Sequence, residues 1–237
     1  MTDRGRLYRL NDRGIAAGPV ICWMSREQRV SDNWGLYHAQ QLALERQVPL
    51  LVVFTLADGF LGATLRQYGF MLRGLEQVAR KLQGFNIPFL LLRGEPQQSM
   101  LRFIEQEQAG CVVCDFDPLR IKRQWFDGVA AVAKVAVIEV DGHNIVPCRF
   151  ASPKREYGAY TLRPKLRRVL AEFLTDIPQL VPHPFGWSTE PEPFDANLLL
   201  SQLQVTAKIG EVSAVQPGEA AAHNALDNFM ECRLDGY

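Results

Sequence analysis

The sequence lacks both the long apolar runs and the leader segment that would send it to a membrane. No uninterrupted apolar stretch among its 237 residues approaches ~18 residues, the length that a transmembrane helix needs. Residues 1–6 are mostly polar or charged and lack the apolar core of a secretory signal. We therefore expect a chain that neither spans a membrane nor is exported.

Cysteine and histidine are too few for a disulfide framework or an evident metal centre. Five cysteines is an odd number in a chain that is large enough to fold without crosslinks, which favours reduced thiols and a cytoplasmic location. The four histidines, at positions 38, 143, 183 and 223, do not have the spacing of metal ligands. We expect no metal site.

Familiar motifs for phosphate binding and nucleophilic catalysis are also missing. No Gly-x-Gly-x-x-Gly follows the first apolar strand, so dinucleotide binding in the usual manner has no support. The sequence has neither the Gly-x-x-x-x-Gly-Lys-Ser/Thr segment that cradles phosphates nor the Gly-x-Ser-x-Gly turn that carries a nucleophile. It therefore identifies no catalytic residue.

The net charge of zero conceals a strong asymmetry along the chain. Residues 1–171 contain 24 Lys or Arg against 16 Asp or Glu, whereas residues 172–237 contain 2 against 10. Much of the basic excess lies between Lys154 and Arg168. Such a cluster can attract phosphates. It is more often a solvated helix face that pairs with acidic segments, and we favour that interpretation.

Strand and helix patterns then alternate five times, which is typical of an α/β fold. The expected strands are residues 20–23, 49–54, 89–92, 111–114 and 135–140, and the expected helices between them are 34–46, 65–83, 97–108 and 121–133. Short links between alternating elements require parallel pairing and right-handed crossovers. We predict a five-stranded parallel, doubly wound (Rossmann-like) sheet in the order 3-2-1-4-5, with a helical C-terminal extension.

The same patterns divide the chain into four parts. We expect an N-terminal extension over 1–17, the α/β domain over 18–174 with a basic helix over 160–170, and a proline-rich acidic connector over 175–216. Residues 217–237, with a helix over 220–234, would begin a second domain that the chain does not contain.

A ligand site is expected where the winding direction of the sheet reverses, at the carboxyl ends of the first and fourth strands. Two charged loops, residues 24–30 and 115–120, should meet there. An aromatic cofactor could lie between them, with Arg26 or Arg120 at its polar edge and Asp115 accepting a hydrogen bond. Alternatively, the charges pair with each other and fix the loops, and the sequence does not decide between these two interpretations.

Two further patterns favour structural roles. Cys111 and Cys114 have redox spacing, but residues three apart on a strand face opposite sides of the sheet, so a shared metal or disulfide is not expected. Asp141 could orient His143 after the fifth strand, yet no Ser or Cys is placed as a nucleophile beside them. We expect a structural role for this segment as well.

Taken together, several motifs in this order resemble class II cyclobutane-pyrimidine-dimer DNA photolyases over about residues 18–237. The matching segments are Trp23–Trp34, Arg66–Tyr68 with Met71–Leu75, Leu92–Pro96, Asp115–Lys122, His143–Cys148, Thr161–Leu166 and Pro217–Ala222. The resemblance implies that residues 18–174 form an α/β antenna domain. It also implies a helical domain with FAD and the damaged DNA, which this chain lacks apart from its first helix.

The resemblance implies a set of cofactor-binding residues, which are Met24, Arg26, Phe54, Asp115, Arg120 and Tyr237. Asp115 matches a family position associated with a deazaflavin (8-HDF), and a folate is the other antenna pigment of related photolyases. Met24, Arg26, Phe54 and Arg120 are its neighbours by fold logic. Tyr237 resembles the tyrosine that begins the flavin site, but one residue cannot hold FAD.

Three functional hypotheses follow. The first is the antenna part of a photolyase that cannot repair DNA alone. The second is a standalone pigment or nucleotide carrier, or a subunit that pairs in trans with a separate helical flavoprotein. The third is a remnant without function. We expect DNA binding to be weak if it occurs, and the apolar residues of the last helix could support a homodimer.

Overall fold

The structure is a computed structural model that describes residues 4–206 and 208–237. Its centre is a six-stranded sheet in the order β1-β6-β5-β2-β3-β4. The strands are β1 (Leu7–Arg9), β2 (Val20–Met24), β3 (Leu50–Leu56), β4 (Phe89–Arg93), β5 (Cys111–Asp115) and β6 (Ala136–Val140). The five strands from β2 to β6 pair in parallel, so the predicted order of these five strands is confirmed.

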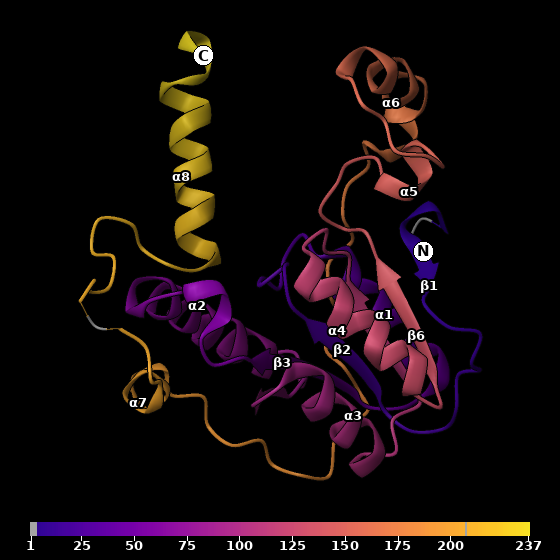
Figure 1. Ribbon diagram of the computed structural model, residues 1–237, viewed down its shortest axis with the longest axis vertical. Coiled ribbons are helices and arrows are strands. Elements are labelled where there is room, and N and C mark those ends of the chain that lie inside the picture. Colours follow the sequence, from indigo (N-terminus) through magenta and orange to yellow (C-terminus); the bar gives the residue numbers. More distant parts are fainter. Residues whose placement is uncertain (1–3, 207) are drawn as a thin grey trace.

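Helices cover both faces of the sheet, as a doubly wound fold requires (Figure 1). They are α1 (Trp34–Arg46), α2 (Leu65–Gln83), α3 (Pro96–Gln106) and α4 (Arg120–Val132). The first two bury their apolar residues with one face of the strands and the last two with the other. The strands between these layers are almost wholly apolar and buried, as parallel strands covered on both faces must be.

The predicted N-terminal extension is wrong in one respect, because residues 7–9 belong to the sheet. Strand β1 pairs antiparallel with β6, with Leu7 opposite Val140. Just before it, the Arg6 guanidinium donates to the backbone oxygens of Asp141, Asn144 and Ile145 at 2.8–3.0 Å. A three-residue strand is too short to produce a readable alternation in the sequence, which explains why the pattern did not reveal it.

The connector contains a helix that the sequence did not indicate. Helix α7 (Ala196–Gln202) packs against α2, and the Asp195 side chain accepts the backbone N–H groups of Asn197 and Leu198 at its start. Residues 174–195 have no helix or strand, as predicted for the proline-rich part. This strap is fixed to the domain where the Gln40 side chain exchanges two hydrogen bonds with the backbone of Val181.

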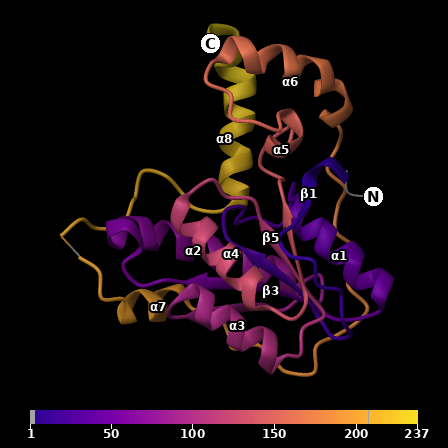
Figure 2. The same ribbon diagram turned by 45° about the vertical axis from the view of Figure 1, so that its right-hand side comes forward.

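Two helical arms rise from the carboxyl edge of the sheet (Figures 1 and 2). One arm comprises α5 (Cys148–Ala151) and α6 (Ala159–Phe173), and the other is α8 (Glu219–Cys232) followed by a short 3-10 turn, Leu234–Gly236. Further 3-10 turns lie at Arg4–Arg6 and Phe60–Gly62. None of the helices in the described residues is long and apolar enough to cross a membrane.

Candidate functional site

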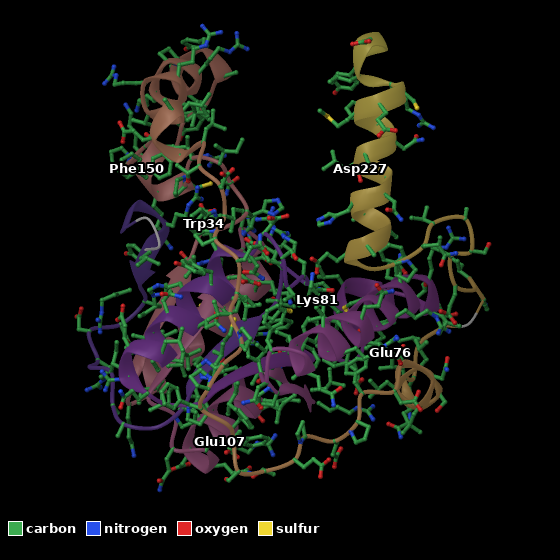
Figure 3. The ribbon with its side chains drawn as sticks, turned by 180° about the vertical axis from the view of Figure 1, so that it is seen from behind. Trp34, Glu76, Lys81, Glu107, Phe150 and Asp227 are labelled. Atoms are coloured by element: carbon green, nitrogen blue, oxygen red, sulfur yellow. The ribbon has the colours of Figure 1, made fainter. Side chains whose placement is uncertain are left out.

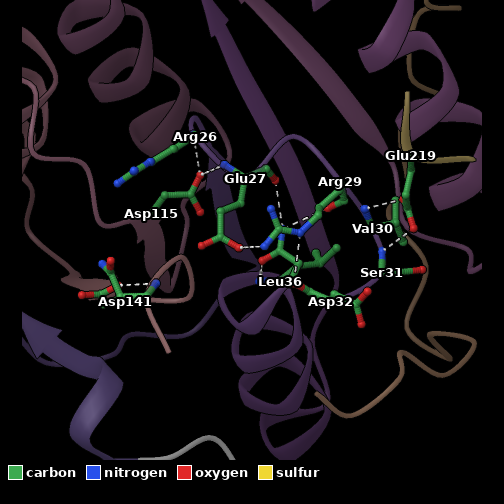
Figure 4. Close-up of polar contacts among 12 residues, drawn as sticks. Arg26, Glu27, Arg29, Val30, Ser31, Asp32, Leu36, Asp115, Asp141 and Glu219 are labelled. Atoms are coloured by element: carbon green, nitrogen blue, oxygen red, sulfur yellow. Dashed lines mark hydrogen bonds and ion pairs between the residues drawn. The ribbon is translucent and has the colours of Figure 1, made fainter. Parts of the chain in front are cut away.

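The two charged loops meet at the sheet edge as predicted, and Asp115 joins them. Its Oδ2 accepts the backbone N–H groups of Ser25, Arg26 and Glu27 at 2.8, 2.8 and 3.1 Å. Figure 4 shows the contacts with Arg26 and Glu27. The side chain is buried, and this burial raises the pKa of Asp115 although the three backbone donors oppose the shift. Asp115 therefore fixes the path of the loop that follows β2.

A cleft of about 300 Å³ lies one strand further along the edge, above the ends of β2 and β3. Its walls come from four segments, namely the loop after β2, the end of β3 with the turn that follows, the first half of α2, and the start of α4. The lining residues are Ser25, Arg26, Gln28, Phe54, Thr55, Leu56, Ala57, Phe60, Ala63, Gln67, Tyr68, Met71, Leu119, Lys122 and Trp125. A mainly apolar hollow with a few polar groups is typical of a site for a small aromatic ligand.

Lys122 is the polar group that sequence reasoning missed in this cleft. Its Nζ donates to the Ser25 hydroxyl at 2.9 Å and lies 5.0 and 4.8 Å from the ring centroids of Phe60 and Trp125. Burial lowers the pKa of Lys122, although Asp117 and Asp115 partly compensate. The ammonium group is a hydrogen-bond donor that lies against two aromatic rings. In such an apolar setting, a hydrogen bond to a polar ligand atom contributes more to binding than it would in water.

The turn after β3 forms the outer wall of the cleft and has an uncommon backbone conformation. Gly59, Leu61 and Gly62 have φ angles of 71°, 48° and 74°, which lie in the left-handed region that glycine adopts without strain. The Tyr68 hydroxyl holds this turn, because it donates to the Ala57 oxygen at 2.5 Å and accepts the Phe60 N–H at 2.9 Å. The turn thus holds Phe60 in the lining of the cleft.

The structure places the predicted cofactor residues in different surroundings. Arg26 and Phe54 line the cleft, whereas Met24 is buried beneath it in the core and Asp115 faces the loop backbone. Arg120 is exposed at the first turn of α4 and outside the lining. Tyr237 is 99% exposed at the far end of the second arm, where its ring contacts only that of Phe229 among aromatic neighbours in the described residues.

Three carboxylates lie close together behind the loop. Glu27 is almost fully buried and pairs with the Arg29 guanidinium at 2.8 Å. Burial, with Asp115 and Asp141 nearby, raises the pKa of Glu27 to about 7. Asp141 itself accepts the backbone N–H of Cys148 at 2.7 Å and the Asn144 amide at 2.8 Å. Asp141 thus has the structural role that we expected, as it holds the start of the first arm.

The pair Cys111 and Cys114 also has a structural role. Cys111 belongs to the core on the side of α1 and α2, whereas Cys114 belongs to the core on the side of α3 and α4. Burial raises the pKa of both thiols, which keeps them protonated and unreactive. Within the residues that the structure describes, no group of three or more His, Cys, Asp or Glu side chains could hold a metal ion.

Comparison with known proteins agrees with this architecture. The model of the DNA photolyase family matches residues 20–184. Deoxyribodipyrimidine photo-lyases of Potorous tridactylus, Arabidopsis thaliana and Methanothermobacter thermautotrophicus are 45%, 38% and 32% identical to the chain over 90%, 93% and 75% of its length.

The chain spans 41%, 46% and 40% of the lengths of these three relatives. The resemblance that the sequence motifs indicated is therefore confirmed for the α/β region. The segment that matches the family model begins at β2 and continues through α6 into the proline-rich strap, so it covers more than half of the chain. The chain therefore belongs to the DNA photolyase family.

Proposed function

We propose that this chain is the pigment-binding α/β part of a photolyase that repairs DNA with light, and that it captures light without repairing DNA by itself. The observation that carries the proposal is the apolar cleft with the partly buried Lys122 at its side. Its volume of about 300 Å³ is at the lower end of the range for small-molecule sites, which suits a planar ring system.

The residues of the cleft fit a deazaflavin, or a folate as the second choice. Phe60 and Trp125 offer faces for ring stacking, while Lys122, Gln28 and Arg26 offer donors for carbonyl and hydroxyl groups at the edge of the ring. A bound pigment would absorb light and pass on its excitation. The protein would hold the ring, exclude water from one side and keep Lys122 pointed at a polar atom.

The residues do not fit FAD. Tyr237, which resembles the first residue of the family's flavin site, is 99% exposed, and one aromatic contact cannot enclose a cofactor. We therefore expect no dimer cleavage by the purified chain with added FAD and light. A loss of dimers above that in a sample without protein would refute this part of the proposal.

Titration of the purified chain with a deazaflavin, followed by absorption and fluorescence, tests the proposal directly. Ala63→Phe fills the cleft and should weaken binding by about tenfold or more, since it removes the space for one ring. Ala131→Phe adds the same side chain at an exposed position of α4 and should not weaken binding. Absence of binding by the parent chain to both a deazaflavin and a folate would refute pigment capture.

A subunit that works with a helical flavoprotein is the second candidate, and the second arm favours it. Helix α8 exposes Leu226 and Met230 by 56% and 54%, one turn apart, so one face of the helix offers apolar area to a partner. We expect this partner to be a helical body, in the same or in a separate chain. The five free thiols fit a reducing, cytoplasmic location for the assembly.

A further inference from the structure

The first turn of α8 is fixed to the loop that borders the pigment cleft through the side chain of Glu219. The two carboxylate oxygens accept the backbone N–H groups of Val30 and Ser31 at 3.0 and 3.1 Å (Figure 4). The Lys81 ammonium on α2 donates to the same carboxylate and to the Ser31 hydroxyl, at 2.7 Å in each case. Glu219 thus connects three segments that are far apart in the sequence.

The charge state of Glu219 suits this role. Hydrogen bonds from Lys81, Ser31 and Val30 outweigh burial and lower the pKa of Glu219 to about 2, so the carboxylate is ionised at neutral pH. The side chain is 11% exposed, and bonds from an ammonium and from paired backbone donors to a carboxylate are among the stronger ones in proteins. The contact is therefore an anchor rather than a transient surface pair.

The residue before the anchor adds a constraint on the backbone. Gly218 has a φ of 97°, and a Cβ atom placed there would overlap the Gln77 side chain of α2. Gln77 in turn donates to the Pro217 oxygen at 3.1 Å. The chain therefore enters α8 in close contact with α2, in a backbone conformation that favours glycine.

Beyond this first turn, α8 has few contacts with the domain. It stands away from the sheet in both overall views, and Figure 3 shows Lys81 at its base and Asp227 midway along the free part. No residue of α8 is buried. The direction in which α8 leaves the domain consequently depends on the contacts at its base.

The loop that Glu219 holds is also a wall of the cleft. Its first half lines the cleft with Ser25, Arg26 and Gln28 and is fixed by Asp115. Its second half, at Val30 and Ser31, is fixed by Glu219. Asn33 stiffens the connection between the halves, because its side-chain amide donates to the backbone oxygens of Glu27 and Arg29. Hydrogen bonds from Asp115, Asn33 and Glu219 thus hold the two halves of the loop in one connected framework.

We propose that Glu219 is a positioning residue that sets the direction of α8 by anchoring it to the wall of the cleft. As a consequence, ligand in the cleft and the seating of α8 favour each other, and this consequence rests on the proposed pigment binding. By thermodynamic linkage, if the anchored position of α8 strengthens ligand binding by a given factor, bound ligand must stabilise that position of α8 by the same factor. The partner that α8 carries would thereby be held at a fixed orientation to the pigment.

The native cysteines allow a direct test. Cys148 on the first arm and Cys232 on α8 are exposed, whereas the other three cysteines are buried. Spin labels attached to these two thiols report the distance between the arms in pulsed electron paramagnetic resonance experiments. Glu219→Gln removes the charge and one acceptor oxygen, so we expect a broader distance distribution and about tenfold faster amide exchange at Val30 and Ser31.

Asp227→Asn is the matched control, because Asp227 is an exposed acid on the free part of α8 and has no ion pair in the described residues. It should leave the distance and the exchange rates unchanged. Unchanged values in Glu219→Gln, or equal changes in both variants, would overturn the proposal. These two readouts need no pigment.

The coupling is tested by titrating both variants with a deazaflavin. Glu219→Gln should bind it several-fold more weakly than Asp227→Asn, and saturating deazaflavin should slow amide exchange at Val30 and Ser31 in the parent chain. Equal affinities would overturn the coupling. If no variant binds a deazaflavin or a folate, pigment capture fails instead, and the distance and exchange measurements still decide whether Glu219 anchors α8.

Discussion

The carboxylate of Asp115, at the end of β5, accepts the backbone N–H of Arg26 at 2.8 Å from the loop after β2. This contact joins the two strands at which the sheet reverses its winding direction. The backbone of Arg26 is thus fixed by a residue 89 positions away, while its side chain remains free to line the cleft. A loop built in this way can present side chains to a ligand without moving its main chain.

Replacement of Asp115 should separate the roles of its charge and its oxygen atoms. Asp115→Ala leaves three backbone donors without an acceptor, two of them buried, so we expect a loss of about 3 kcal/mol in the free energy of unfolding. Asp115→Asn keeps one acceptor oxygen and should cost less, since burial already disfavours the charge. Urea unfolding measures both, and Asp58→Ala at an exposed position is the control. Equal losses in the two Asp115 variants would contradict this account.

The raised pKa of Glu27 predicts a pH-dependent stability. Between about pH 4.5 and 7 the unfolded chain releases this proton and the folded chain retains it, so the contribution of Glu27 to stability falls as the pH rises. Since the amide introduced by Glu27→Gln stays neutral, this variant should gain on the order of 2–3 kcal/mol relative to the parent chain from pH 5 to pH 8.

Urea unfolding of both chains across this pH range gives the difference directly. Comparison with the parent chain cancels the contributions of groups that do not interact with Glu27, whereas the effect of its charge on Asp115, Asp141, Arg26 and Arg29 is part of the measured difference. Glu45→Gln, at an exposed position of α1, should show a difference that does not change with pH. A constant difference for Glu27→Gln would argue that this carboxyl titrates normally.

The sequence could predict elements whose signals are local. Helices α1 and α2 have the expected bounds, because Asn33 caps the first and a regular apolar stripe marks the second. Strand β1 and helix α7 were missed since both are short and owe their stability to β6 and α2.

The sequence predicted the edge of the sheet at which the site lies, but not the position of the cleft along that edge. Strand order and loop charge bring Asp115 to the loop after β2, as expected. The cleft itself lies towards β3, because the turn around Phe60 folds over it. The dipeptide Asp58-Gly59 signals a turn at this point but not the direction in which the turn folds. The sequence analysis did not single out Lys122, because only the distant Phe60 and Ser25 give its ammonium group a partly buried position.

Lys122 should determine how firmly a pigment is held. Lys122→Met keeps the apolar length of the side chain but removes its donor, so affinity for a deazaflavin should fall by about tenfold. Stability should be unchanged or higher, because the variant no longer has to bring an ammonium group into this apolar setting. Fluorescence titration and urea unfolding give the two values. Lys134→Met, at an exposed position, should alter neither, and a similar affinity in both variants would exclude Lys122 from the site.

The first arm should give weak DNA binding that depends on salt. Arg163 and Arg167 are exposed one turn apart on α6 without an ion pair in the described residues, and Tyr160 nearby is 83% exposed. Phosphate contacts by a few cations weaken steeply as salt rises, so we expect binding at about 50 mM salt and loss of it near physiological salt.

Fluorescence anisotropy with a labelled duplex measures this salt dependence. Changing Arg163 and Arg167 to Gln should reduce binding at low salt, whereas the same change at the exposed Arg66 and Arg102 should not. Tight binding that survives physiological salt would contradict a weak electrostatic contact. Equal losses in both pairs would indicate a response to overall charge alone.

Self-association of the chain should depend on the exposed face of α8. Leu226 and Met230 lie one turn apart and are each more than half exposed, so two copies can bury these side chains together when the protein is concentrated. Changing both to Glu should shift the chain towards monomer in sedimentation velocity experiments, because charges are costly to bury in such a contact.

Val132 and Ile145 provide the matched control, since they are 61% and 55% exposed at positions outside α8. Changing these two residues to Glu adds the same charge and should leave association as it is. If the parent chain remains monomeric at the highest concentrations, the exposed face of α8 does not mediate self-association.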